Sequence, residues 1–194
     1  MAPRKKFTKE DIISAAFNIA KDEGLDAITI RKVAEQLGSS IAPIYVNFND
    51  VEELIQEVIQ HTFTIVKNLI LEQNTNHPFR DIGIASIKFA KQYSILYRDL
   101  IMKDNPYMQH DEEKLQFIIE QMKKDSILDG FSDHELRHII LKMDIFQTGL
   151  AVSVANGLLP DDFTEEKMIA MLDDVAEDVV LAARIRKDKK NNDS

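Results

Sequence analysis

A literal H-E-x-x-H pattern occupies residues 134–138, which read HELRH. On a helix this spacing places two imidazoles one turn apart, where both can bind zinc, and it positions the glutamate between them as a general base. The pattern therefore allows two chemistries: a zinc-dependent hydrolase, and a metal sensor that uses the histidine pair alone.

The residues around this motif favour a simpler interpretation. Ser132 and Glu135 have the S-x-x-E spacing of a capping box, which would make the glutamate part of a helix start and leave both histidines on a solvated first turn. No convincing third zinc ligand follows, because Asp144 lies off that face and Glu165 and Glu166 come after a Gly-Leu-Leu-Pro break. We therefore predict no enzyme, no cofactor and no metal site, and keep the zinc hydrolase and the metal sensor as alternatives.

The elements that carry this motif are predicted to be helices throughout. Apolar residues recur three and four apart along nearly the whole chain, and glycine occurs only 6 times in 194 residues. The expected fold class is all-α, with about nine helices. Because the chain has no cysteine and no run of 18 apolar residues, we expect no disulfide, no membrane span and a cytoplasmic location.

Three short helices are predicted within the first fifty residues. The T-K-E-D sequence at Thr8 is a capping box for the first helix, which ends at Gly24. Thr29 caps the second helix, IRKVAEQL, which ends at Gly38. The GSS turn that follows makes the second and third helices a helix-turn-helix, whose third helix would enter the major groove of DNA.

A proline marks the start of the third helix. Ser40 is predicted to be the N-cap, and Pro43, three residues later, then falls in the first turn, where backbone N–H groups have no partner within the helix. Ile44 and Phe48 face inward. The D-V-E-E sequence at Asp50 is predicted to cap a fourth helix immediately afterwards.

The remaining helices are longer. An apolar stripe continues the fourth helix to about residue 70, and further helices are predicted from Pro78, over residues 111–128, over residues 132–158 and from Thr164 toward the C-terminus.

Charge is distributed unevenly between the two parts of the chain. Residues 49–194 hold 17 Lys and Arg against 27 Asp and Glu, whereas residues 1–48 hold 7 against 6 and include a basic arm of Arg4, Lys5 and Lys6. The formal net charge of -9 therefore does not exclude a nucleic-acid partner for the first part.

The first quarter of the chain contains three motifs: TIRKVAEQLG, the block S-x-x-x-I-Y-x-N-F from Ser40 to Phe48, and E-E-L at residues 52–54. Together they resemble the tetracycline-repressor (TetR) family of bacterial transcription regulators. The resemblance implies a DNA-binding domain over residues 1–49 and a ligand-binding and dimerisation domain over residues 50–194. It also implies a homodimeric repressor that binds double-stranded DNA at a palindromic operator.

The DNA contacts that the resemblance implies come from the basic arm and from the second and third helices. Hydroxyl groups suit phosphate oxygens, an arginine suits guanine O6 and N7, and lysines supply counterion release. The predicted set is Arg4, Lys5, Lys6, Thr29, Arg31, Lys32, Ser40, Ile41, Ala42, Pro43, Tyr45 and Asn47.

Two departures from the family pattern affect this prediction. The third helix has few hydrogen-bonding side chains, so its base readout would depend on thymine methyl groups and DNA shape. Val51 replaces the lysine that often opens the fourth helix in the family, and Asn47 replaces a frequent histidine. We therefore expect the basic arm to carry an unusually large share of the affinity.

The second domain is expected to form the dimer and to hold an effector. The resemblance implies dimerisation through the last two long helices, and release from DNA by a small apolar or aromatic molecule that binds among the middle helices. Candidate ligand-binding residues are large or adaptable side chains with a few polar groups: Phe63, Phe89, Tyr93, Met102, Tyr107, Phe117, Met122, Met143, Phe146 and Gln147. An alternative keeps the DNA-binding domain but makes the second domain a docking surface for another protein.

Overall fold

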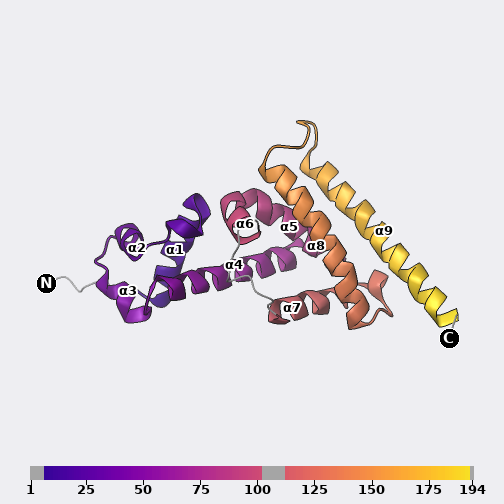
Figure 1. The fold of residues 1–194 in the computed structure, drawn as a ribbon, viewed down its shortest axis with the longest axis horizontal. Coiled ribbons are helices and arrows are strands. Elements are labelled where there is room, and N and C mark those ends of the chain that lie inside the picture. Colours follow the sequence, from indigo (N-terminus) through magenta and orange to yellow (C-terminus); the bar gives the residue numbers. More distant parts are fainter. Residues whose placement is uncertain (1–6, 102–111, 193–194) are drawn as a thin grey trace. The chain divides into compact units, whose positions relative to one another are not determined.

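The computed structural model describes residues 7–101 and 112–192, and over these ranges the chain folds into nine α-helices and no strand (Figure 1). In chain order the helices are α1 (Lys9–Glu23), α2 (Ile30–Leu37), α3 (Ala42–Asn47), α4 (Val51–Gln73), α5 (Pro78–Gln92), α6 (Ser94–Ile101), α7 (Glu112–Met122), α8 (Asp133–Ala155) and α9 (Glu165–Asn192). Two 3-10 turns are η1 (Leu25–Ala27) and η3 (Ser126–Leu128). The predicted all-α class is confirmed. None of the described helices is both long and apolar enough to cross a membrane.

The described residues form two compact units. Unit 1 comprises residues 7–67 and 93–101, and unit 2 comprises residues 68–92 and 112–192. Most of α4 therefore belongs to unit 1 and its last turns to unit 2, while α5 and α6, consecutive in the chain, belong to different units. The predicted division between residues 49 and 50 concerns DNA binding, and it stays a prediction.

Most of the predicted helix caps are confirmed. The Thr8 hydroxyl accepts a hydrogen bond from the Asp11 N–H at 3.1 Å, and the Asp11 carboxylate accepts one from the Thr8 N–H at 2.9 Å, which completes a capping box. Thr29 accepts from the Lys32 N–H at 3.2 Å, and Asp50 accepts from the Glu53 N–H at 2.8 Å. Each bond satisfies an N–H group that the first turn of a helix would otherwise leave without a partner.

The predicted N-cap of the third helix is wrong. The N-cap of α3 is Ile41 rather than Ser40, and no side chain caps this helix. Gly38 ends α2 in the left-handed conformation, with φ of 62°, and the Ser39 N–H donates back to the Ala34 carbonyl at 2.9 Å. Because this closure of α2 holds residues 38 and 39, the chain becomes helical one residue later than expected. Pro43 still lies in the first turn.

A buried carboxylate connects α6 to the first helices within unit 1. Asp99 is 2% exposed, and its Oδ2 accepts a hydrogen bond from the Leu25 N–H at 2.8 Å. Gly24 precedes that N–H with φ of 96°, and a Cβ atom there would lie 2.4 Å from Asp99 Oδ2. Only glycine fits both the backbone conformation and the space. The turn after α1 is therefore shaped by a residue 75 positions further along the chain.

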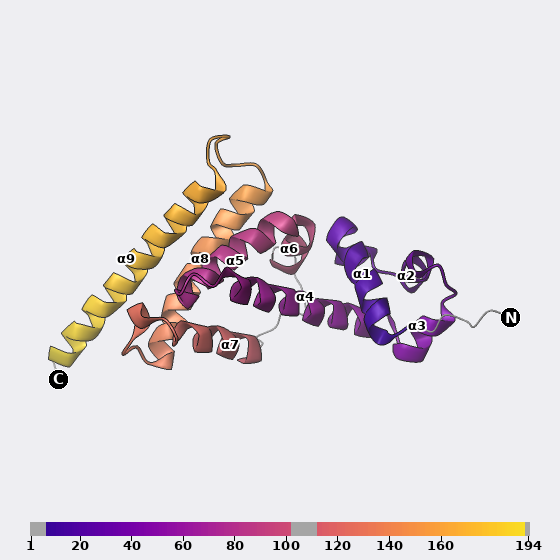
Figure 2. The same ribbon diagram turned by 180° about the vertical axis from the view of Figure 1, so that it is seen from behind.

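The core of unit 2 lies between α5, α7, α8 and α9. Its fully buried side chains include Ile119, Met122, Leu136, Ile139 and Leu172. Helix α9 lies alongside α8 when the molecule is viewed from either side (Figure 2). Leu172 of α9 packs onto Gly83 of α5 so closely that a Cβ atom at Gly83 would lie 2.3 Å from Leu172 Cδ2. Close helix approach at a glycine fixes where α9 meets α5.

Helix α8 begins with the predicted capping box. The Glu135 carboxylate accepts hydrogen bonds from the Ser132 N–H and hydroxyl, both at 2.8 Å, and forms an ion pair with Lys187 of α9 at 3.0 Å. The backbone N–H of Ser132, then Lys187 and the Ser132 hydroxyl, lower the pKa of Glu135 from 4.5 to about 2. The ionised carboxylate of Glu135 thus connects the start of α8 to the C-terminal part of α9.

We predict that Gly24→Ala destabilises the protein by about 3 kcal/mol, because the new methyl group meets both the left-handed backbone and the Asp99 carboxylate. Gly38→Ala is the matched control: Gly38 also has positive φ, but open space surrounds its Cβ direction, so a cost of only about 1 kcal/mol is expected. Urea unfolding measures both. Equal costs for the two variants, or no coupling between Gly24→Ala and Asp99→Ala in a double-mutant cycle, would contradict the proposed contact.

We also predict that Glu135→Gln destabilises the protein by about 1 kcal/mol at neutral pH, after discounting for partial solvent exposure. Since folding lowers the pKa of Glu135, its contribution is fully present above pH 4.5 and is lost as pH falls toward about 2. The difference in urea midpoint between wild type and Glu135→Gln should therefore shrink over that interval. Glu166→Gln, in the first turn of α9, is the control and should show a smaller difference at neutral pH.

Candidate functional site

Helix α3 has one buried face and one exposed face. Ile44 and Phe48 are 0% and 2% exposed and pack into unit 1, which confirms their predicted inward orientation. Ile41, Tyr45 and Val46 are 48%, 55% and 83% exposed. Large apolar side chains rarely gather on the solvent face of such a short helix unless that face meets a partner. This exposed face is better suited to contact methyl groups and ring edges of a partner than to contact its hydrogen-bonding groups.

The polar residues that were predicted to contact DNA from the second helix lie at the start of α2. Thr29 is exposed, and its hydroxyl is used as the N-cap acceptor. Arg31 is exposed and donates from Nε to Glu35 Oε1 at 3.2 Å, while Lys32 pairs with Glu23. Both predicted cationic contacts are therefore held by carboxylates of their own unit, and DNA would have to compete with exposed pairs of the kind that contribute little to stability.

The other predicted residues of this region differ in exposure. Ser40 and Ala42 are exposed, and Pro43 and Asn47 are half-buried. The Asn47 amide donates to the Pro43 carbonyl at 2.8 Å, so this donor is turned back onto its own helix. Arg4, Lys5 and Lys6 lie outside the described residues.

Two residues of this surface were not among the predicted contacts. Val46 is the most exposed of the apolar residues on α3. Lys9 of α1 forms an ion pair with Glu57 of α4 at 2.5 Å, and its Nζ lies 5.3 Å from the centre of the Phe48 ring. The bond to Glu57 raises the pKa of Lys9. Helical spacing predicts that Val46 points away from the core, as the structure shows, whereas no local pattern pairs residues 9 and 57.

The predicted ligand-binding residues are divided between the two units. Phe63 and Tyr93 belong to unit 1, where the Tyr93 and Phe17 rings meet edge to face with centroids 5.8 Å apart. In unit 2, Phe89 and Met122 are buried, and Phe117 and Phe146 are half-buried. Met143 and Gln147 line one cavity. Met102 and Tyr107 lie outside the described residues.

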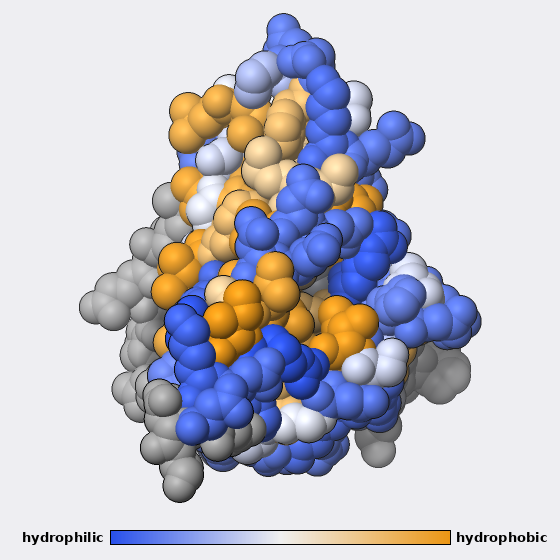
Figure 3. Space-filling model, turned by 90° about the vertical axis from the view of Figure 1, so that its right-hand side faces the viewer, coloured by the Kyte–Doolittle hydropathy of each residue, from blue (hydrophilic) through white to orange (hydrophobic). Residues whose placement is uncertain are grey.

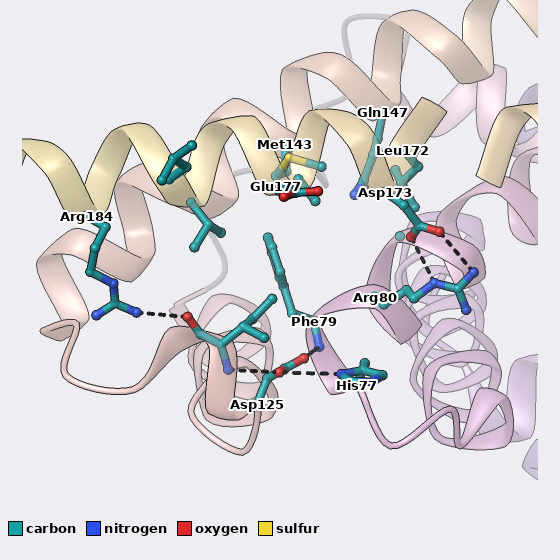
Figure 4. Close-up of a pocket in the computed structure, with 15 residues that line it drawn as sticks. His77, Phe79, Arg80, Asp125, Met143, Gln147, Leu172, Asp173, Glu177 and Arg184 are labelled. Atoms are coloured by element: carbon teal, nitrogen blue, oxygen red, sulfur yellow. Dashed lines mark hydrogen bonds and ion pairs between the residues drawn. The ribbon is translucent and has the colours of Figure 1, made fainter. Parts of the chain in front are cut away.

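That cavity lies within unit 2, has a volume of about 640 Å³, and is lined from α5, η3, α8 and α9 (Figure 4). Its wall is largely apolar: Phe79, Ile127, Met143, Leu172, Ala176, Val180 and Leu181. Both the size and the apolar lining are typical of small-molecule sites. The sequence missed most of this wall because five of these residues lie on η3 and α9, which were not expected to face the ligand.

The cavity also carries polar groups, most of which have partners in unit 2. Arg80 binds Asp173 through two hydrogen bonds of 2.8 and 3.0 Å, and Arg184 donates to the carbonyls of Asp129 and Ile127 at 2.7 and 2.9 Å. The buried Asp125 accepts from the Phe79 N–H at 3.1 Å. Figure 4 shows the Arg80–Asp173 and Arg184 contacts at well-separated places in the lining.

The HELRH motif takes the form of a helix start. The rings of His134 and His138 lie 4.6 Å apart, centroid to centroid, but Glu135 is held by Ser132 and Lys187. Its lowered pKa makes it a poor general base. No group of three or more His, Cys, Asp or Glu in the described part of the chain is arranged to hold a metal ion.

The surroundings of the two histidines are also unfavourable for a dication. They line a cleft of about 410 Å³ together with Lys142, Arg186, Lys187 and Lys189. Four cationic side chains against one carboxylate repel Zn²⁺. The geometry offers no support for either zinc chemistry.

Comparison with known proteins agrees with the helix-turn-helix geometry. Residues 12–58 match the sequence profile of the family described as bacterial regulatory proteins, tetR family. No curated protein sequence matches the chain significantly.

Solved structures of regulators share the whole fold. A transcriptional regulator from Rhodococcus sp. RHA1 superposes with a TM-score of 0.69 at 16% identity, covering 91% of this chain and 97% of that one. A TetR-family protein from Vibrio parahaemolyticus gives 0.56 at 17% identity, covering 86% and 97%. The fatty acid degradation regulator FadR from Bacillus halodurans gives 0.59 at 17% identity, covering 91% and 97%.

The exposed third helix, the family match over the amino-terminal helices and a fold shared along nearly the full length of known regulators lead to one conclusion. Residues 12–58 match the TetR family of bacterial regulatory proteins, and the chain shares the fold of known transcriptional regulators.

Proposed function

We propose that this regulator is a repressor that binds a palindromic operator in double-stranded DNA as a homodimer and is released by a small apolar or aromatic effector. The observation that carries the DNA-binding part is the division of α3 into a buried face, with Ile44 and Phe48, and an exposed face, with Ile41, Tyr45 and Val46. A helix anchored on one side and apolar on the other can enter the major groove and contact thymine methyl groups.

The polar residues around α3 are assigned to the DNA backbone. Thr29, Ser40 and Tyr45 place hydroxyl groups for phosphate oxygens, and Arg31 and Lys32 supply cations once they exchange their carboxylate partners for DNA. The basic arm of Arg4, Lys5 and Lys6 adds three further charges. In this assignment the domain of residues 1–49 binds DNA, and residues 50–194 form the dimer and bind the effector.

The dimer is assigned to α8 and α9. Large apolar side chains that are 39% to 67% exposed lie on these two helices: Leu141, Ile145, Met171, Leu181 and Ile185. Figure 3, which faces the side of the molecule that carries α9, shows apolar patches among hydrophilic surface. Two symmetric DNA-binding domains are needed to bind both halves of a palindrome. We therefore assign these exposed apolar side chains to contacts with a second copy of the chain.

The charge along α9 favours one direction of pairing. Residues 165–178 contain six acidic and one basic residue, whereas residues 179–192 contain five basic and one acidic. Two copies of α9 that cross antiparallel about a two-fold axis bring the acidic part of each opposite the basic part of the other. Asp174 and Asp178 on one side, and Arg186 and Lys189 on the other, are exposed and have no ion pair within the described residues.

Selection from a random pool of DNA duplexes tests the DNA-binding part. We expect a palindrome whose half-sites are rich in thymine, and we expect Val46→Asp to weaken binding to it by about tenfold or more, because the new carboxylate faces the DNA. Leu71→Asp is the matched control, since Leu71 is also exposed and the change in net charge is the same. Salt-sensitive binding without a consensus, or equal loss in both variants, would contradict the proposal.

Sedimentation tests the dimer. Asp174→Lys combined with Asp178→Lys should weaken dimerisation by about tenfold, with the largest effect at low salt, because attraction across the two-fold axis becomes repulsion. Adding Arg186→Glu and Lys189→Glu to the same chain should restore the dimer. Glu52→Lys with Glu72→Lys is the control for net charge and should leave it unchanged. A protein that is monomeric yet selects a DNA sequence would instead favour the alternative in which the second domain docks another protein.

A further inference from the structure

One amide side chain of the cavity in unit 2 has no hydrogen-bond partner among the described residues. Gln147 of α8 is 6% exposed, lines the cavity, and makes no hydrogen bond to any described residue. Because the side chain lines the cavity, its amide is available to a polar atom of a bound molecule. Figure 4 shows the Gln147 side chain extending from α8 into the region where the lining residues converge. A bound molecule with a polar atom at this point would hydrogen-bond to the Gln147 amide.

The ionisable groups of the lining differ in whether they have partners. Arg80 is held by Asp173, Arg184 is held by two backbone carbonyls and lies over the Phe131 ring, and His77 lies 3.9 Å from Asp125. Both arginines thereby already have hydrogen-bond acceptors, and the charge of Arg80 is neutralised by Asp173, so an anionic ligand would compete with existing contacts.

Glu177 of α9 is the exception among these groups. It lines the cavity but forms no hydrogen bond or ion pair with any described residue. It is exposed, which places its carboxylate at the open side of a largely apolar space. A carboxylate beside apolar walls favours a ligand that is cationic at one end and apolar elsewhere. Such a ligand pairs with the carboxylate and at the same time packs against the apolar lining.

We propose that this cavity binds an apolar molecule that carries a protonated amine, with Glu177 accepting from the ammonium group and Gln147 binding a further polar atom of the ligand. The body of the ligand packs against Phe79, Met143 and Leu172. The inference rests on the proposed function only for its consequence, the release of DNA. The binding itself depends on unit 2 alone.

Calorimetric titration with two probes of equal chain length tests the charge preference. Decylamine and decanoate, each below its micelle-forming concentration, present the same apolar body with opposite charges. We expect wild type to bind decylamine at least about tenfold more tightly than decanoate. Glu177→Gln should remove that preference. Asp174→Asn is the matched control, because it removes an exposed carboxylate of α9 that does not line the cavity, and it should keep the preference.

A third variant tests the amide. With 10-aminodecan-1-ol, whose hydroxyl can reach a second polar group, Gln147→Leu should weaken binding, whereas binding of decylamine should be unchanged or stronger. The proposal is overturned if wild type binds decylamine and decanoate equally, or if neither probe binds. It is also overturned if Asp174→Asn reduces the preference for decylamine as much as Glu177→Gln does.

The same probes separate this inference from the proposed function. Binding is titrated in the absence of DNA, and release is then measured on the selected duplex. If decylamine binds through Glu177 but leaves the DNA bound, the cavity assignment holds and effector release fails. If other compounds release DNA and none depends on Glu177 or Gln147, the repressor assignment holds and the cavity assignment fails.

Discussion

The contact between Gly83 and Leu172 sets the arrangement of unit 2. A glycine in the middle of α5 lets Leu172 of α9 reach the helix backbone, and a single methyl group at residue 83 would remove the space that this side chain occupies. One residue further along α9, Asp173 binds Arg80 of α5 through two hydrogen bonds. An apolar contact and a charged one thus fix α9 on α5 at the same level. From there α9 continues past η3, where Arg184 and Lys187 bind backbone carbonyls of residues 127–130.

The cavity is a consequence of fixing α9 at these separated points. Leu172 and Asp173 hold α9 against α5. Three turns further along α9, Arg184 holds the helix against the segment that includes η3. Between them α9 presents short or branched side chains, Ala176 and Val180, which fill little of the distance to Phe79 and Met143. A largely apolar cavity with an open side, bounded at two separate levels by polar contacts, has the form of a small-molecule site.

Local signals explain what could be predicted from the sequence. Thr8, Thr29, Asp50 and Ser132 each cap a helix with a bond to a residue three positions away, and a spacing of three is visible in any sequence. The prediction that Ser40 caps α3 is wrong, although serine has the same chemistry. Gly38 ends α2 in the left-handed conformation, and that ending uses the residues that a cap at Ser40 would need. Neighbouring turns compete for the same backbone groups, and the sequence does not indicate which one prevails.

Contacts between distant residues could not be predicted in the same way. The Leu25–Asp99 bond spans 74 residues and the Arg80–Asp173 pair spans 93, and both join residues whose types are common throughout the chain. For the ligand site, side-chain type correctly drew attention to Met143 and Gln147, which lie one turn apart on α8, but also to Phe63 and Tyr93, which belong to the other unit. The identity of a large or polar side chain indicates what it can bind, while the close packing at Gly83 decides which of them share a cavity.

Helix α9 brings the proposed cavity and the proposed dimer face together. Leu181 lines the cavity and is also 56% exposed, so it belongs to both surfaces, and Glu177 lies one residue from Asp178 of the dimer face. In the proposed dimer, a ligand that neutralises Glu177 and presses on Leu181 acts on a helix that we assign to the pairing of two copies. In this proposal the ligand needs no contact with the DNA-binding helices, because the spacing of the two DNA-binding domains follows from how the copies pair. A difference of a few kcal/mol between two packings of α9 is enough to change which pairing is populated.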